Sequence, residues 1–112
     1  MKVTAVGKDI GIPPRKMKLA ADMVRGKKVE EALAILRFVP TASARAILKV
    51  IKSAAANAEN NYEMTPADLI IVDIQANEGH TLKRFKSQGR GRVNPILKRS
   101  THIVVSVDEE GI

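Results

Sequence analysis

Residues 69–107 read LIIVDIQANEGHTLKRFKSQGRGRVNPILKRSTHIVVSV, and this stretch decides the fold. Its first part alternates apolar with polar side chains, which predicts a central β-strand. The apolar face of that strand is expected to consist of Ile70, Val72, Ile74 and Ala76, with Asp73 and Gln75 on the other face. The last part, HIVVSV, predicts a partner strand of similar length, with one face made of Ile103, Val105 and Val107.

The connection between these two strands is far longer than their pairing requires. An antiparallel pair needs about two to five connecting residues, whereas residues 79–102 supply GHTLKRFKSQGRGRVNPILKRSTH. The connection is therefore either a disordered loop or a hairpin that extends beyond the domain, and we favour a hairpin at about 78–102. Apolar residues fit its two arms, while Gly89 and Gly91 mark its tip. At about 3.3 Å per residue, arms of roughly ten residues would project about 30 Å.

The predicted hairpin is strongly basic. It contains no acidic residue between positions 79 and 102, and its seven basic residues are Lys83, Arg84, Lys86, Arg90, Arg92, Lys98 and Arg99. An isolated two-stranded ribbon is marginal in water, and repulsion among these charges weakens it further. RNA phosphates would relieve that repulsion, because arginine offers planar bidentate contacts and glycine lets the backbone approach closely. The plainer alternative is a flexible, solvated basic loop without a specific partner.

The region before this stretch predicts helices. Pro13 and Pro14 favour a helix start, and apolar residues at helical spacing followed by Gly26 predict a helix over roughly 14–25. The same spacing, with two glutamates in the first turn, predicts a second helix that ends before Pro40.

Thr41 is a suitable N-cap for a third and longest helix at about 42–60. The apolar stripe of that helix is expected to consist of Ala44, Ile47, Leu48, Ile51, Ala54, Ala55 and Ala58. The alternating opening residues predict a short edge strand at about Lys2 to Lys8. Together these elements predict an α+β fold, in which three helices pack on a small three-stranded antiparallel sheet and a long β-hairpin protrudes.

Composition and charge point to a polyanionic partner. The chain has 112 residues with a net charge of +7, and its length predicts a single domain over 1–112. Nucleic acid is the leading partner class, followed by an anionic membrane. Few aromatic residues predict an aliphatic core and disfavour base stacking. The absence of cysteine excludes disulfides and cysteine-based zinc sites, and we expect no cofactor or metal. Without an apolar leader or a run of roughly 18 apolar residues, the expected location is cytoplasmic.

Two further basic groups accompany the hairpin. One is spread over the first helix and the turn after it, and consists of Arg15, Lys16, Lys18, Arg25, Lys27 and Lys28. The other is spaced along the third helix opposite its apolar stripe, and consists of Arg45, Lys49 and Lys52. Each group alone fits an ordinary solvated face. Three basic groups on one small protein favour extensive phosphate contact.

Four blocks of the chain resemble the bacterial large-ribosomal-subunit protein twenty-two family. They are PRKMKLAADMVRGKKVEEALAIL at 14–36, KVIKSAAANAENN at 49–61, NEGHTLKRF at 77–85 and GRGRVNPILKRSTHIVV at 89–105. The resemblance covers nearly the whole chain in the right order. The RGKK turn, the SAAANAENN helix end and the KRSTHI segment are specific in combination.

The resemblance implies a structural and assembly role on the ribosome, without catalysis. It implies a compact domain on the outer surface of the large subunit and a hairpin that enters ribosomal RNA and lines the nascent-peptide exit tunnel. Implied partners are large-subunit rRNA, neighbouring ribosomal proteins and the nascent chain, with no membrane and a monomeric free state. Implied RNA contacts are the first-helix group and the hairpin group named above. Two departures are Pro13, where the family often has a capping serine, and Pro95, where the returning arm often has a polar or basic residue. Because Pro95 cannot donate a ladder hydrogen bond, we expect it to disturb strand pairing.

Three other classes of protein remain as alternatives. An enzyme could pair His80 or His102 with Asp73 or Glu78, but neither histidine stands beside a nucleophile in a recognisable motif. A structural role at a strand start is the better interpretation of His102. A generic basic RNA- or DNA-binding protein outside the ribosome would share the charge but lacks a recognition-helix pattern. A membrane-surface protein would need a wide apolar face that the hairpin does not have.

Overall fold

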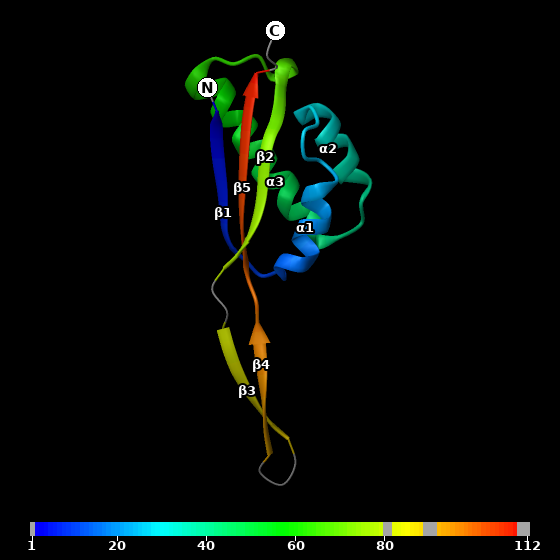
Figure 1. Ribbon diagram of the computed structural model, residues 1–112, viewed down its shortest axis with the longest axis vertical. Helices are drawn as coiled ribbons and strands as arrows, with labels where there is room; N and C mark the ends of the chain where they lie inside the picture. The colour runs from blue at the N-terminus through cyan, green and yellow to red at the C-terminus, as the bar shows by residue number, and fades with distance from the viewer. Residues whose placement is uncertain (1, 80–81, 89–91, 110–112) are drawn as a thin grey trace.

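The computed structural model describes the backbone of residues 2–79, 82–88 and 92–109, and the side chains of residues 2–79 and 99–109. In chain order the elements are β1 (Val3–Ile10), α1 (Pro14–Asp22), α2 (Val29–Phe38), α3 (Ala42–Tyr62), the 3-10 turn η1 (Pro66–Asp68), β2 (Leu69–Glu78), β3 (Leu82–Gln88), β4 (Arg92–Lys98) and β5 (Thr101–Glu109). The helices cover one face of a sheet formed by β1, β5 and β2, while β3 and β4 extend beyond it (Figure 1). The predicted α+β fold with a protruding hairpin is confirmed, and the extents are 66 × 26 × 18 Å.

The sheet has the strand order β1-β5-β2, and both pairings are antiparallel. β5 pairs with β1 through Val3 and Val107, and with β2 through Glu78 and Thr101. The prediction that β2 is central is therefore wrong, because the opening strand takes the other side of β5 and leaves β2 at an edge. The edge position predicted for β1 is confirmed.

A β-bulge in β2 changes which of its residues face the core. Ile71 pairs with Val107 and Asp73 pairs with Ser106, so Val72 is an extra residue on this strand. The side chains buried along β2 are those of Leu69, Ile71, Ile74 and Ala76. The predicted apolar face is thus correct after the bulge and wrong at positions 70 and 72, because one inserted residue reverses the alternation. The predicted face of β5 is confirmed, since Ile103, Val105 and Val107 are buried.

The helices follow their predicted apolar stripes at most positions, but in α3 the predicted Leu48 and Ala55 are only partly buried and Val50, which was not predicted, is buried. The end of α1 also differs from the prediction. This helix ends at Asp22 instead of residue 25, and Gly26 adopts a φ of 80° in the turn that follows. The N–H of Gly26 donates to the carbonyl of Ile71 at 3.0 Å, so this segment pairs with β2 instead of continuing the helix. At the start of α3, the N–H of Ala44 donates to Thr41 Oγ1 at 3.2 Å, which confirms the predicted N-cap.

The core is aliphatic, as predicted. Its buried side chains are those of valine, alanine, methionine, leucine and isoleucine, and the described aromatic residues Phe38 and Tyr62 are exposed. α3 lies very close to β1, because a Cβ added at Gly7 would stand only 2.8 Å from Val50 Cγ2. In residues 2–79, 82–88 and 92–109, no helix combines the length and apolarity needed to cross a membrane.

Candidate nucleic-acid interface

The hairpin is an antiparallel ribbon that continues from the sheet. β3 and β4 pair from Leu82 opposite Lys98 to Gln88 opposite Arg92, without a register shift (Figure 1). The ribbon begins where β2 and β5 separate, so its two arms prolong two neighbouring strands of the body. The predicted tip residues Gly89 and Gly91 lie outside the described residues.

Pro95 is accommodated within this ribbon. It stands opposite Phe85, and the register continues on both sides of it. In a two-stranded ribbon, every second N–H points away from the partner strand, and a proline at such a position costs no ladder hydrogen bond. The disturbance of strand pairing expected at Pro95 is therefore absent from the described backbone.

Most basic side chains of the hairpin lie outside the described residues. Arg90 and His80 lie outside the described residues, and the structure describes only the backbone for Lys83, Arg84, Lys86, Arg92 and Lys98. Arg99 is the exception. Its guanidinium Nη1 lies 3.8 Å from Glu78 Oε1, and both side chains are more than half exposed. An exposed pair of this kind contributes at most about 1 kcal/mol, so Arg99 can be redirected to a phosphate at little cost.

The base of the hairpin consists of residues 78, 79 and 99–102 together with the loop that they contact, and we call it the neck. Three hydrogen bonds hold the neck in place. Gly79 N–H donates to the Ser100 carbonyl at 2.9 Å. Thr101, which is fully buried, donates its hydroxyl to the Ile12 carbonyl at 2.5 Å. The N–H of Asp9 donates to His102 Nδ1 at 3.1 Å, which gives this histidine a structural contact at the strand start. The neck is therefore attached to the loop before α1.

A polar hollow of about 610 Å³ opens beside the neck. It is lined by Pro13, Pro14, Arg15, Glu78 and Arg99. The hollow brings an arginine of the first-helix group close to an arginine of the hairpin, although the two are far apart in sequence. Two guanidinium groups at one opening suit an anionic ligand such as a phosphate.

The first-helix group occupies an exposed surface of α1 and the turn that follows it. Each of its six members is exposed to solvent. The turn is held to the sheet, because Ile71 donates its N–H to the Lys27 carbonyl at 2.9 Å and Lys28 forms a β-bridge with Ile70. The backbone that carries Lys27 and Lys28 is thus fixed.

Arg25 differs from the rest of this group. Its Nη1 lies 2.5 Å from Asp22 Oδ1, and its Nη2 donates to the Ile74 carbonyl at 2.8 Å. Two sides of the guanidinium are therefore engaged within the protein. The pairing with Asp22, three residues earlier, could have been inferred from helical spacing, whereas the contact with Ile74 depends on the tertiary structure.

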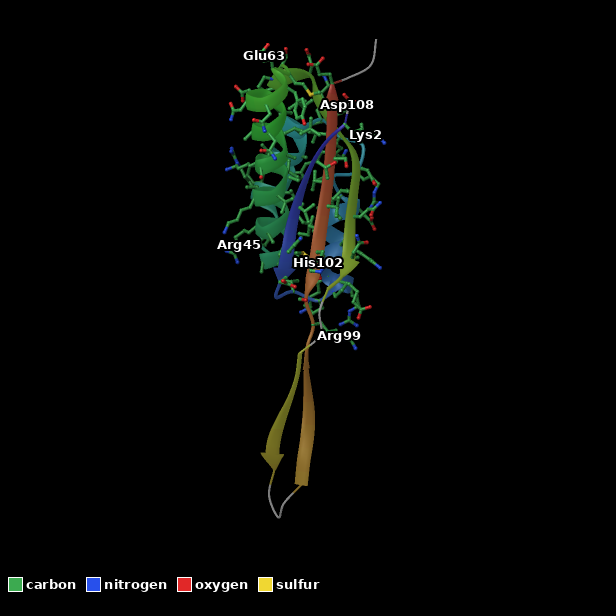
Figure 2. All side chains as sticks on the ribbon, turned by 90° about the vertical axis from the view of Figure 1, so that its left-hand side faces the viewer. Lys2, Arg45, Glu63, Arg99, His102 and Asp108 are labelled. Atoms are coloured by element: carbon green, nitrogen blue, oxygen red, sulfur yellow. The ribbon has the colours of Figure 1, made fainter. Side chains whose placement is uncertain are left out.

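Basic residues also lie on the body outside the first-helix group. Figure 2 shows Arg99 and His102 at the hairpin end of the body, and Lys2, Glu63 and Asp108 at the opposite end. The third basic group, Arg45, Lys49 and Lys52, lies exposed along α3.

The fold and these surfaces define a small α+β protein with a protruding two-stranded ribbon, whose sequence is basic, and an exposed basic surface on α1 and the turn after it. The model of the family described as ribosomal protein L22p/L17e matches residues 5–108, and the chain belongs to that family. A large ribosomal subunit protein uL22 of Dehalococcoides mccartyi is 58% identical over 107 residues, covering 96% of this chain and 98% of the relative. The protein of the same name from Lactobacillus delbrueckii subsp. bulgaricus is 48% identical over 105 residues, covering 94% and 90%.

Proposed function

We propose that this protein is a structural constituent of the large ribosomal subunit that binds large-subunit rRNA and assists its assembly. Its location is then the ribosome in the cytoplasm, and its role requires no catalysis. The observation that carries the proposal is the two-stranded arm of β3 and β4, which extends beyond the body and has basic but no acidic residues. The family and the names of the relatives support the same role.

Two sets of residues would contact the rRNA. The body set is Arg15, Lys16, Lys18, Arg25, Lys27 and Lys28, and the hairpin set is Lys83, Arg84, Lys86, Arg90, Arg92, Lys98 and Arg99. Arg15 of the body set lines the hollow beside the neck, and Lys27 and Lys28 lie next to Ile71 and Ile70 further along the body. An RNA that follows the body from the neck could therefore engage both sets. Phosphate contacts of this kind position the protein without reading sequence.

The hairpin would carry the finer part of the function, which is to line the nascent-peptide exit tunnel with its tip. An arm of roughly 30 Å can place residues deep in RNA while the body stays outside. Partners in this arrangement are the rRNA, neighbouring ribosomal proteins and the nascent polypeptide.

Sedimentation of tagged protein with large subunits through a high-salt wash tests the proposal. The complete protein should remain with the subunits, and a protein found only at the top of the gradient would refute the ribosomal role. A deletion of residues 86–95 should stay docked through the body set, and chemical probing should show altered RNA reactivity chiefly around the exit tunnel. Loss of the truncated protein from subunits would contradict the anchoring role of the body.

A further inference from the structure

A second surface, distinct from the basic ribbon, is an apolar groove of about 630 Å³ beside α1. Its lining comes from the loop at 11–13, from one side of α1 and from residues 39 and 41–43 before and at the start of α3. Most of the lining is hydrocarbon, and Lys16 is its one charged side chain among the residues that the structure describes. We refer to this feature as the α1/α3 groove.

The side of α1 that borders the groove is apolar where a solvated surface would be polar. Lys16, Leu19 and Met23 follow one another at spacings of three and four residues, so they share this side. Leu19 is 69% exposed and Met23 is 42% exposed, although the opposite side of the same helix already packs in the core. An exposed leucine and methionine along a groove favour contact with another molecule, and methionine adapts its shape to different partners.

The electrostatic character of the groove selects for negative charge. Lys16 gives the groove a positive charge that no acidic lining residue balances in the part of the chain that the structure describes. The wall at Ala42 is also the start of the long helix α3, whose dipole places partial positive charge there. A ligand with apolar side chains and a nearby carboxylate matches both properties.

We propose that the α1/α3 groove is a docking site for a short segment of another polypeptide, with two or three apolar side chains and an acidic residue. Its volume is in the range of sites that hold small ligands. RNA fits this surface poorly, because single-stranded RNA is bound by aromatic stacking and rows of cations, and the groove offers aliphatic walls and one lysine. A second copy of the chain is disfavoured, because each copy has a charge of +7 and two copies would repel each other. A stable dimer also needs about 800 Å² of buried surface from each partner, which is more than a short groove on one side of α1 supplies.

This inference deepens the proposed function, on which it rests for the class of partner, because it names a surface and a chemistry for contact with another polypeptide. Binding at the groove does not require rRNA, so a failure of this inference and a failure of the proposed function are distinguishable. Leu19 and Met23 belong to neither RNA-contact set, so they separate the two activities. Lys16 belongs to both surfaces, because it lines the groove and is a member of the body set, so the variants that test the groove leave Lys16 unchanged.

The test is an NMR titration of the ¹⁵N-labelled, full-length free protein with defined probes. One probe is a pentapeptide of three leucines and two aspartates with blocked ends, and its matched control has lysines in place of the aspartates. The acidic peptide should shift the amides of Leu19, Met23 and Ala42 saturably, and the lysine peptide should bind about tenfold more weakly. A uridine hexanucleotide tests the alternative ligand class, and it should shift the basic surfaces while leaving the groove amides in place.

A double variant, Leu19→Gln with Met23→Gln, should weaken the acidic peptide about tenfold and leave RNA affinity unchanged. Both residues are exposed, so the fold should survive, as a thermal melt would verify. Tyr62→Gln is the matched control, because Tyr62 is 50% exposed at the other end of α3. The proposal is overturned if the acidic peptide fails to shift groove amides, if the double variant binds it normally, or if the hexanucleotide displaces it from the groove.

Discussion

Removing positive charge from α1 and its following turn gives a quantitative test of RNA binding. The structure divides the six basic residues of this surface into different classes. Arg25 is engaged with Asp22 and with the Ile74 carbonyl, and Lys28 forms a β-bridge with Ile70, so these two are left unchanged. Arg15, Lys16, Lys18 and Lys27 are exposed, and these four are the residues to change. Each phosphate contact contributes about 0.7 to 0.9 to the slope of log K against log salt. A fourfold change to glutamine should therefore make the slope about 3 less steep.

The assay is fluorescence anisotropy with a labelled large-subunit rRNA fragment, between about 50 and 300 mM potassium chloride. If the complete protein makes about eight phosphate contacts, its slope is roughly −6 to −7, and the fourfold variant should fall to roughly −3 to −4. A control variant with Arg45, Lys49 and Lys52 changed to glutamine removes a similar charge from α3. Its slope should change by less than about 1, because we assign no RNA contact to that group.

Arg25→Gln tests a residue that serves both the fold and the RNA. The slope should become less steep by about 0.7 to 0.9, which is the contribution of one phosphate contact. The melting temperature should also fall by about 4 °C, because a hydrogen bond worth about 1 kcal/mol to the Ile74 carbonyl is lost. A folded fourfold variant with the slope of the unchanged protein would refute the assignment of this surface to RNA. An equal change per charge in the α3 control would show that only net charge matters.

Further predictions concern packing and the neck. Gly7→Ala should destabilise the fold by about 1 to 3 kcal/mol in urea titrations, since the added Cβ would meet Val50 Cγ2 at 2.8 Å, and unchanged stability would mean that α3 shifts freely. Thr101→Val should cost about 1 to 3 kcal/mol by leaving the Ile12 carbonyl unpaired, with Thr101→Ser less affected; equal or greater loss in the serine variant would contradict this reasoning. Deletion of 86–95 should change the melting temperature by less than about 3 °C, and a larger fall would show that the ribbon supports the body.

The sequence predicted the helices well because their burial follows local spacing. Met17 and Ile47 are fully buried at the positions where a helical period places them. Strand faces were predicted less completely, because the bulge at Val72 arises from the pairing of β2 with β5. The amino-acid sequence of β2 alone does not indicate this bulge. The same non-local origin explains the strand order, in which the opening strand joins the last one.

The candidate interface was predictable in composition but not in detail. A run of basic residues without acids is visible in the sequence, and so is the excess length of the connection that carries it. The distinct environment of Arg25 depends on a carbonyl 49 residues away in the chain, and the buried hydroxyl of Thr101 depends on a loop 89 residues away. Such contacts are created by tertiary folding, so periodicity and charge counting do not reveal them.

The hydrogen bonds at the neck give the body control over where the hairpin points. Because the arm is long and joins the body only at the neck, a rotation of the whole arm by about 5° at the neck moves a tip about 30 Å away by roughly 3 Å. That displacement is about the length of one hydrogen bond and would separate a side chain from the phosphate it contacts. The hydrogen bonds of Thr101, His102 and Gly79 therefore fix the direction in which the arm leaves the body. Substitutions there are expected to impair tip contacts that lie far beyond the reach of the substituted side chains.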